Sequence, residues 1–389
     1  MTASTPARAT AQPTLDLLYG DVEDEVRASV RKMLADRCDA AAVVARTESD
    51  EPYDTAAWRT LAAEMGLAGL LVPERLGGAG ASAREVAVVL EEVGRTVAPV
   101  PYLGSAVLAT SALLACDDGA QGVPELVSGL ASGRRTGTLA VPLSAASGGF
   151  RAVDASSGAL RGRVTSVPDL EAADLVVVPA TDEDGPALYA LDVPAPGLAV
   201  SPRVPLDLTR RLADLDLDRA SGTRVASGHD AERALASAWR AGAGLLPSEM
   251  LGVAEWCLDT TVAYVSGRYQ FGRPVGSFQA LKHRLADLWA TVSTARAAAR
   301  AAADALATRA SDTNVLVAVA QAYGSDAVVL AAEEALQLHG GIGMTWEHPV
   351  HLYVGRAKSA QLAFGTPERH LDRLATLLDL PAPGESRPS

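Results

Sequence analysis

The stretch of sequence with the clearest chemical character runs from Gln337 to Thr366 and reads QLHGGIGMTWEHPVHLYVGRAKSAQLAFGT. Gly340 and Gly341 follow a helix-length run, and a glycine readily takes the left-handed conformation that ends a helix. Bare backbone at a helix end lets a phosphate group or a flat ring come close. Thr366 and Pro367 then have the N-cap and first-turn signature of another helix. The stretch predicts a cofactor site at a helix end, and a plain C-cap is the structural alternative.

Three ordered blocks of the sequence together resemble the acyl-CoA dehydrogenase family: WRTLAAEMGLAGLLVPERLGGAGASAREVAVVLEEVG from Trp58 to Gly94, RYQFGRP from Arg268 to Pro274, and Gln337-Leu-His-Gly-Gly-Ile-Gly with Glu347-His-Pro and Gly365-Thr366. The resemblance covers most of the chain. It implies a flavoprotein that takes part in the FAD-dependent α,β-dehydrogenation of an acyl-CoA thioester and passes electrons to an acceptor protein. Such a reaction needs a base for the α proton and a flavin for the β hydride.

The resemblance assigns six cofactor-binding residues. In the family, residues of an R-x-x-F-G segment, of the helix start that follows it and of a Q-x-x-G-G segment hold the adenine and pyrophosphate half of an FAD that is seated mainly in the neighbouring subunit. A further family Thr also contacts the cofactor. The matching residues are Arg268, Phe271, Gln279, Gln337, Gly341 and Thr366. A guanidinium group pairs well with phosphate, whereas the structural alternative makes Arg268 a surface charge and Phe271 a core anchor.

The base is where the sequence departs most from the family. Most members carry a catalytic Glu directly before the Gly-Thr pair, and Phe364 matches that position. Other branches carry the Glu in the helix before R-x-x-F-G, where Gly242 is found. Glu249 lies about two helical turns further on, so it is no simple substitute. Glu347 is interpreted as a solvated loop acid, and the chain is predicted to have no catalytic base at either family position.

The flavin seat is also unusual. The family's middle domain holds the isoalloxazine ring with a T-E-P-x-x-G-S-like segment, whereas Leu139 to Gly149 reads LAVPLSAASGG. Ser144, Ser147 and the glycines can still donate hydrogen bonds, but the pattern is degenerate.

Three short motifs resemble one group within the family: Asp207-Leu-Thr-Arg-Arg, Thr345-Trp-Glu-His and Gly355-Arg-Ala. They are similar to actinobacterial enzymes that dehydrogenate bulky CoA thioesters such as steroid side chains. In that group two homologous chains form an α2β2 tetramer and one chain type supplies the base. The favoured function is therefore the Glu-lacking subunit of a heterotetramer in lipid or steroid catabolism. The alternatives are a self-associating, self-sufficient dehydrogenase with a relocated base, and a scaffold that has lost flavin.

Composition excludes several other classes of function. The chain has 389 residues, a net charge of -13 and a pI near 5.0, so it has no electrostatic footprint for nucleic acid or anionic membrane. Three scattered cysteines, Cys38, Cys116 and Cys257, predict reduced thiols and neither a metal site nor a disulfide framework. The first twenty residues lack the apolar core of a secretion signal. We therefore expect a cytoplasmic protein with no metal.

The order of helical and β-prone segments predicts an α+β fold, which the resemblance identifies as the acyl-CoA dehydrogenase fold. The expected parts are a disordered lead at 1–20, an N-terminal α-helical domain at 21–132, a middle antiparallel β domain at 133–228, a C-terminal four-helix bundle at 229–380 and a tail at 381–389. Asp21 marks the first helix, and Ser82-Ala-Arg-Glu85 is a capping box before another. Pro247 is expected to kink or restart the helix that carries Gly242.

Overall fold

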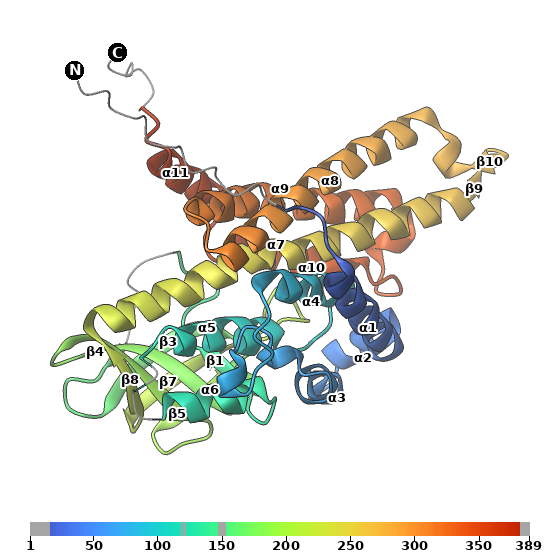
Figure 1. Ribbon diagram of the computed structural model, residues 1–389. Helices are drawn as coiled ribbons and strands as arrows, with labels where there is room; N and C mark the ends of the chain where they lie inside the picture. The colour runs from blue at the N-terminus through green and yellow to red at the C-terminus, as the bar shows by residue number, and fades with distance from the viewer. Residues whose placement is uncertain (1–15, 118, 120–121, 147–152, 382–389) are drawn as a thin grey trace, which may run out of the picture.

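The computed structural model describes residues 16–117, 119, 122–146 and 153–381. Most of the lead predicted for 1–20 and nearly all of the tail predicted for 381–389 lie outside the described residues. Helices of the N-terminal part lie beside a β-sheet, and long helices of the C-terminal part pack across both. Two of these long helices, α7 and α8, project from the rest of the molecule as a hairpin (Figure 1).

The N-terminal part is helical throughout its described residues: α1 Asp21–Arg37, α2 Ala40–Thr47, α3 Thr55–Arg59, π-helical η1 Thr60–Glu64, 3-10 turns η2 Leu67–Gly69 and η3 Glu74–Leu76, α4 Ala83–Arg95, π-helical η4 Leu103–Ala109, α5 Thr110–Leu114 and α6 Val123–Ala131. The first helix begins at Asp21, as predicted. The predicted capping box is also present, because Glu85 accepts from the backbone N–H of Ser82 at 2.8 Å and Ser82 Oγ accepts from Arg84 N–H at 3.1 Å.

The middle part is one sheet built from eight strands: β1 Gly137–Leu139, β2 Val153–Asp154, β3 Leu160–Pro168, β4 Leu175–Asp182, β5 Gly185–Asp192, β6 Leu198–Pro202, β7 Leu212–Ala220 and β8 Thr223–Ser227. The strand order is β6-β7-β3-β2-β4-β5-β8, with β1 also paired to β4. Most pairings are antiparallel, as predicted, but β1 and β2 run parallel to β4. Since β3 and β4 run in opposite directions, a strand placed between them must be parallel to one of the two.

The C-terminal part comprises α7 Gly228–Gly267, the short strands β9 Tyr269–Gln270 and β10 Arg273–Pro274, 3-10 turn η6 Val275–Ser277, α8 Gln279–Thr308, α9 Thr313–Leu338, 3-10 turn η7 Gly340–Met344, α10 Val350–Leu362 and α11 Pro367–Leu377. The central helix α9 packs against α7, α8, α10 and α11. By length and composition α9 would cross a membrane, but 67% of its most apolar window is buried inside the protein. It is the core helix of the bundle.

Pro247 does not interrupt its helix, contrary to the expectation from sequence. Helix α7 runs for 40 residues through this position. Proline lacks an N–H, so the carbonyl of Ala243, four residues earlier, loses its usual helical donor. The side-chain amide of Gln321 on α9 donates to that carbonyl at 2.8 Å. A neighbouring helix therefore satisfies the group that the proline leaves unpaired.

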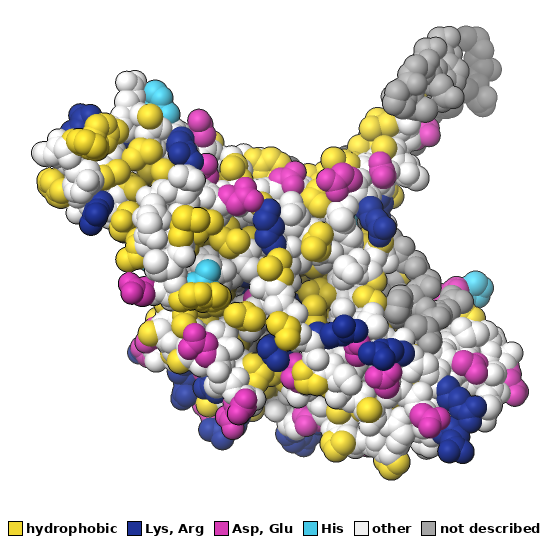
Figure 2. Space-filling view, turned by 180° about the vertical axis from the view of Figure 1, so that it is seen from behind, with side chains coloured by type: hydrophobic (Ala, Val, Ile, Leu, Met, Phe, Trp, Pro, Cys, Tyr) yellow, Lys and Arg dark blue, Asp and Glu magenta, His cyan; other side chains and the backbone are white. Residues whose placement is uncertain are grey.

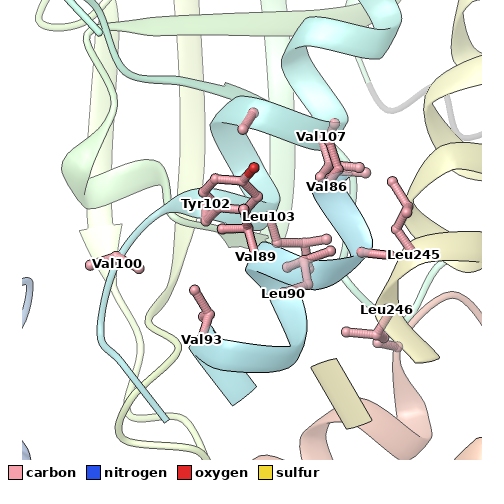
Figure 3. Packing of buried hydrophobic residues seen from close by; sticks show 14 of the residues in the cluster. Val86, Val89, Leu90, Val93, Val100, Tyr102, Leu103, Val107, Leu245 and Leu246 are labelled. Carbon is pink, nitrogen blue, oxygen red and sulfur yellow. The ribbon is translucent and has the colours of Figure 1, made fainter. Parts of the chain in front are cut away.

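The main hydrophobic core joins the N-terminal helices to α7. Valines and leucines along one face of α4 meet Tyr102 and Leu103 on one side and Leu245 and Leu246 of α7 on the other (Figure 3). The α4 and α7 backbones approach so closely that a methyl group at Gly252 would lie 1.9 Å from the carbonyl oxygen of Glu91. Glycine is required at this crossing, which fixes α7 against the N-terminal part.

Candidate functional site

The two positions that the resemblance assigns to a catalytic Glu lie in contact with each other. A methyl group at Gly242 on α7 would be 2.5 Å from Cζ of Phe364 and 2.7 Å from a δ-carbon of Leu108. The ring of Phe364, which is 3% exposed, thus fills the space between α7 and η4. Both positions face one site, and an apolar ring occupies it.

The backbone of Phe364 is bonded to the segment that would seat a flavin ring. Phe364 has a left-handed φ of +58°, and its N–H donates to the carbonyl of Leu143 at 2.8 Å. Leu143 N–H donates in turn to the carbonyl of Ser166 at 3.1 Å. Trp239 lies edge-on to Phe364, and its indole N–H donates to the carbonyl of Ala145 at 3.1 Å. These polar groups of the segment are therefore used inside the chain.

Glu249 is not available as a relocated base. It is 1% exposed, and one Arg210 nitrogen lies 2.5 Å from both of its carboxylate oxygens. Arg356 donates to the same carboxylate at 2.8 Å. Two guanidinium groups occupy this carboxylate, so it has no free direction from which to take a proton from a substrate. Glu347 is exposed in the loop before α10.

The bonds of Arg356 extend into a buried polar network that links the middle and C-terminal parts of the chain. Its Nε donates to Asp207 at 2.5 Å and an Nη to Thr209 at 2.7 Å. Burial alone would raise the pKa of Asp207, but Arg356 and Arg210 together hold that pKa below its ordinary value. The motifs Asp207-Leu-Thr-Arg-Arg and Gly355-Arg-Ala thus form one structural unit.

Asp169 adds a carboxylate of different character to this region. Its side chain accepts from the backbone N–H of Gly104, the second residue of η4, at 3.0 Å. Burial raises its pKa to about 6, against the attraction of Arg210. The start of η4, which carries Leu108 one turn later, is therefore anchored to the sheet by an acid that titrates unusually high.

Five of the six predicted cofactor-binding residues lie on exposed surface at the end of the α7–α8 hairpin and at the nearby end of α9: Arg268, Phe271, Gln279, Gln337 and Gly341. The ring of Tyr264, four residues before Arg268, stacks at 4.5 Å on His339 at the end of α9, which brings the two groups together. Thr366 lies apart from them, two residues after Phe364 at the closed site. Hydrophobic and basic side chains gather at the hairpin end (Figure 2, upper left).

Three residues of this region leave groups open to another molecule. Phe271 is 91% exposed; its left-handed φ of +53° belongs to the two-residue turn that it forms with Gly272 between β9 and β10, a turn in which glycine or asparagine is usual. Arg268 makes no ion pair within the described ranges of the chain. At Gly341 a methyl group would meet open space, so packing does not require glycine there. All three suit a surface that another molecule covers.

FAD therefore fits one of its two expected contact regions and not the other. An exposed guanidinium, an exposed aromatic face and bare glycine backbone suit the adenosine and pyrophosphate half. The ring seat does not fit, because the backbone N–H and C=O groups of both Leu143 and Ala145 already have partners within the chain. Ser144 is exposed, whereas Ser147 and the two glycines after it lie outside the described residues.

Sequence reasoning missed several residues of the site. Trp239 reaches both Phe364 and Ala145, and the signal for it was a tryptophan one turn before Gly242 in an otherwise alanine-rich helix. His370 on α11 is buried and stacks on the other side of Trp239 at 6.0 Å. Burial lowers the pKa of His370 to about 4, so its imidazole is neutral at pH 7. No spacing rule connects it to Phe364.

Comparison with known proteins places this geometry in a family. A model of the acyl-CoA dehydrogenase C-terminal domain matches residues 234–378, and one of the N-terminal domain matches residues 20–121. The relative "Acyl-CoA dehydrogenase IpdE2" of Mycolicibacterium smegmatis is 36% identical over 90% of this chain and 96% of its own length. "Acyl-CoA dehydrogenase FadE34" of Mycobacterium tuberculosis is 36% identical over 82% of this chain and 42% of its own.

Two solved structures are also similar to the chain. One, titled "Tcur3481-Tcur3483 steroid ACAD G363A variant", has a TM-score of 0.82 and 29% identity, covering 94% of this chain and 99% of the other. The ChsE4-ChsE5 complex from Mycobacterium tuberculosis has a TM-score of 0.83 and 28% identity, covering 95% and 100%. The predicted fold is confirmed, and this chain belongs to the acyl-CoA dehydrogenase family of flavin-dependent oxidoreductases.

Proposed function

We propose that this chain is the subunit of a heteromeric acyl-CoA dehydrogenase that lacks the catalytic base. In this proposal Arg268, Phe271, Gln279, Gln337 and Gly341 hold the nucleotide half of an FAD whose ring sits in a homologous, Glu-bearing partner. When bound, FAD accepts the hydride from the β carbon of the acyl-CoA. The proposal makes the chain a contributor to the partner's active site and gives its own site no chemical step.

The packing of Phe364 against Gly242 is the observation that carries the proposal. A base must come within about 3 Å of the α proton, and the side chain at the family's main position is instead a ring sealed between Leu108 and α7. Glu249, the acid about two turns further along the same helix, is held by two arginines. Thr366, beside Phe364, has no flavin ring to contact if the seat stays closed, so its family role is not proposed here.

The relatives support the same proposal. Two solved structures that resemble this chain are named as pairs, Tcur3481-Tcur3483 and ChsE4-ChsE5, and one of the titles names a steroid acyl-CoA dehydrogenase. We infer a homologous partner subunit, an electron-acceptor protein and a bulky acyl-CoA, such as a steroid-derived one, as substrate. The cytoplasmic location and the lack of nucleic-acid and membrane partners remain predictions.

The direct test is anaerobic mixing of the purified chain with FAD and acyl-CoA thioesters of several sizes. We expect negligible bleaching of the flavin absorbance, because loss of a general base typically costs about 10² to 10⁴-fold in rate. Rapid bleaching by the lone chain would overturn the proposal in favour of a self-sufficient enzyme with a relocated base. If neither the chain nor its complexes contain flavin, the chain is a scaffold.

A further inference from the structure

Five rings form a continuous column between α7 and the turn that contains Gly340 and Gly341. Tyr264 stacks on His339 at 4.5 Å, and the His339 ring lies 4.2 Å from that of His348. His348 lies 6.4 Å from Trp256, whose ring stacks on Tyr353 of α10 at 3.4 Å with an interplanar angle of 3°. The column joins α7, the end of α9, the loop before α10 and α10 itself.

The hydrogen bond that His348 accepts in the column requires a neutral imidazole. His339 Nδ1 lies 2.7 Å from the carbonyl oxygen of Ala335, and a carbonyl accepts only, so this nitrogen carries the proton. Its Nε2 is buried without a partner. His348 Nδ1 accepts from the N–H of Val350 at 3.3 Å, so that nitrogen carries no proton. The bond of His339 can be made in either protonation state, whereas the bond of His348 is lost when its Nδ1 gains a proton.

Among the described residues, no carboxylate lies close enough to pair with a positive charge on either of these two imidazoles. Tyr264 faces them from α7, and His351 faces them from α10; the exposed Glu347 is the sequence neighbour of His348. Within the described residues neither imidazole forms an ion pair with a carboxylate. Burial lowers the pKa of His339, and burial followed by the neighbouring His339 and His351 lowers the pKa of His348.

The column lies between the two halves of the predicted nucleotide grip. Arg268 follows Tyr264 by one helical turn, and its N–H donates to the Tyr264 carbonyl at 2.9 Å. His339 lies two residues after Gln337 and two before Gly341. The relative position of the hairpin end and the glycine turn is therefore set where Tyr264 meets His339.

We propose that Tyr264, His339 and His348 are positioning residues for the nucleotide grip, and that protonation of His348 opens the column and releases the bound nucleotide. This proposal rests on the proposed function, because that function identifies the ligand as the adenosine and pyrophosphate half of FAD. Because the closed column binds the second proton poorly, acid favours the open arrangement. Retention of FAD is thereby made sensitive to pH below about 6.5, the ordinary value for histidine.

The test compares three variants in the complex that is isolated through a tag on this chain. His348→Phe keeps a stacking ring that cannot be charged, His348→Ala removes the ring, and His229→Gln is the control because His229 is fully exposed. FAD affinity is measured at pH 7.5 and pH 5. We expect the wild type and the control to lose about tenfold in affinity on acidification, because the closed column disfavours the charged imidazole. His348→Phe should lose less than about twofold, and His348→Ala should bind weakly at both pH values.

An equal loss in wild type and His348→Phe would overturn the proposal. Hydrogen exchange of the lone chain separates this failure from failure of the proposed function. Protection factors of residues 340–347 should fall between pH 7.5 and 5 in the wild type and not in His348→Phe, whether or not FAD binds. If protection falls with pH but FAD does not bind, the pH-dependent opening of the column is supported and the proposed binding of the nucleotide is contradicted. Unchanged protection in the wild type would contradict the column itself.

Discussion

At the scale of single residues, the proposed function depends on a phenyl ring at the position where the family resemblance expects a carboxylate. Phe364 occupies the position of a family base, and it also closes the space from which a substitute could act. The contact with Gly242 couples the two positions, since a side chain at either one excludes a large side chain at the other. A phenyl ring at position 364 thus both removes the expected base and fills the space beside Gly242.

This coupling gives a double-mutant prediction for Gly242→Ala and Phe364→Leu. The added methyl clashes with Phe364, and overpacking a core costs about 1–3 kcal/mol, whereas replacing a helical glycine by alanine gains about 1 kcal/mol. We expect Gly242→Ala to lower the free energy of unfolding in the wild type. In the Phe364→Leu background the loss should shrink by about 1 kcal/mol in urea titrations. Strictly additive effects would mean that the two side chains do not compete for one space.

Asp169 gives a prediction about pH. Its pKa is raised from 3.8 to about 6 in the folded chain, so the ionised form destabilises the fold above pH 6, and this cost disappears as the pH falls toward 3.8. Asp169→Asn removes the charge and keeps an acceptor for the Gly104 N–H. At 1.36 kcal/mol per unit, the variant should gain about 3 kcal/mol of stability at pH 8. The gain should be much smaller at pH 4.5. Chemical unfolding at both pH values checks this, and an equal change at both would contradict the raised pKa.

At the scale of elements, the long helix α7 is the support of the site. It carries Trp239, Gly242 and Glu249 in the interior and ends at Arg268 on the hairpin. A break at Pro247 would separate these two regions, and the Gln321 amide on α9 prevents it by filling the place of the missing N–H.

The role of Gln321 can be tested with Pro247→Ala. Gln321→Leu leaves the Ala243 carbonyl buried and unpaired, which costs about 1–3 kcal/mol. Pro247→Ala returns a backbone N–H to that carbonyl, so in this background Gln321→Leu should cost about 1 kcal/mol less. Thermal or urea unfolding of the four proteins gives the coupling energy. A cost that is unchanged by Pro247→Ala would show that Gln321 stabilises the bundle in another way.

The sequence predicted those features of the fold and site that depend on residues close together in the chain. Caps and glycine turns act within a few residues, so Ser82, Gly340 and Pro367 correctly marked helix ends. The family resemblance singled out Gly242 and Phe364 separately, and their contact is visible only in the structure. The partner of Pro247 and the network around Arg356 depend on residues 74 to 149 positions apart. Sequence periodicity cannot predict such contacts, because they form only when distant helices and strands pack against each other.

At the scale of the whole molecule, a closed site and an open surface lie at opposite ends of α7. The chain buries its own base position and exposes Phe271, an aromatic residue with strained backbone, at the end of a projecting hairpin. Exposed apolar surface of this kind marks an interaction site. Both features are those expected under the proposed function, in which this subunit contributes cofactor-binding residues to an active site in another chain.

Arg268→Ala tests the hairpin's contribution to the assembled complex. If its guanidinium bonds the pyrophosphate, the variant should weaken FAD binding by about 1.5–3 kcal/mol. Arg273→Ala is the matched control, since that guanidinium lies on the ring of Phe278 at 3.8 Å, and its effect should be smaller. Equilibrium dialysis of FAD against the complexes provides the measurement. Equal affinities for wild type and Arg268→Ala would return Arg268 to the role of a surface charge.

The most direct test of the account is the number of FAD molecules per chain in the complex that copurifies with this protein. If the partner subunit has an open seat for the flavin ring and this chain has a closed one, the complex should contain one FAD for every two homologous chains. The lone chain should contain little FAD. The count comes from the flavin absorbance of the released cofactor and a quantitative amino-acid analysis. One FAD for every chain, or a lone chain saturated with FAD, would contradict a closed ring seat at Leu143 and Ala145 and with it the partner-subunit function.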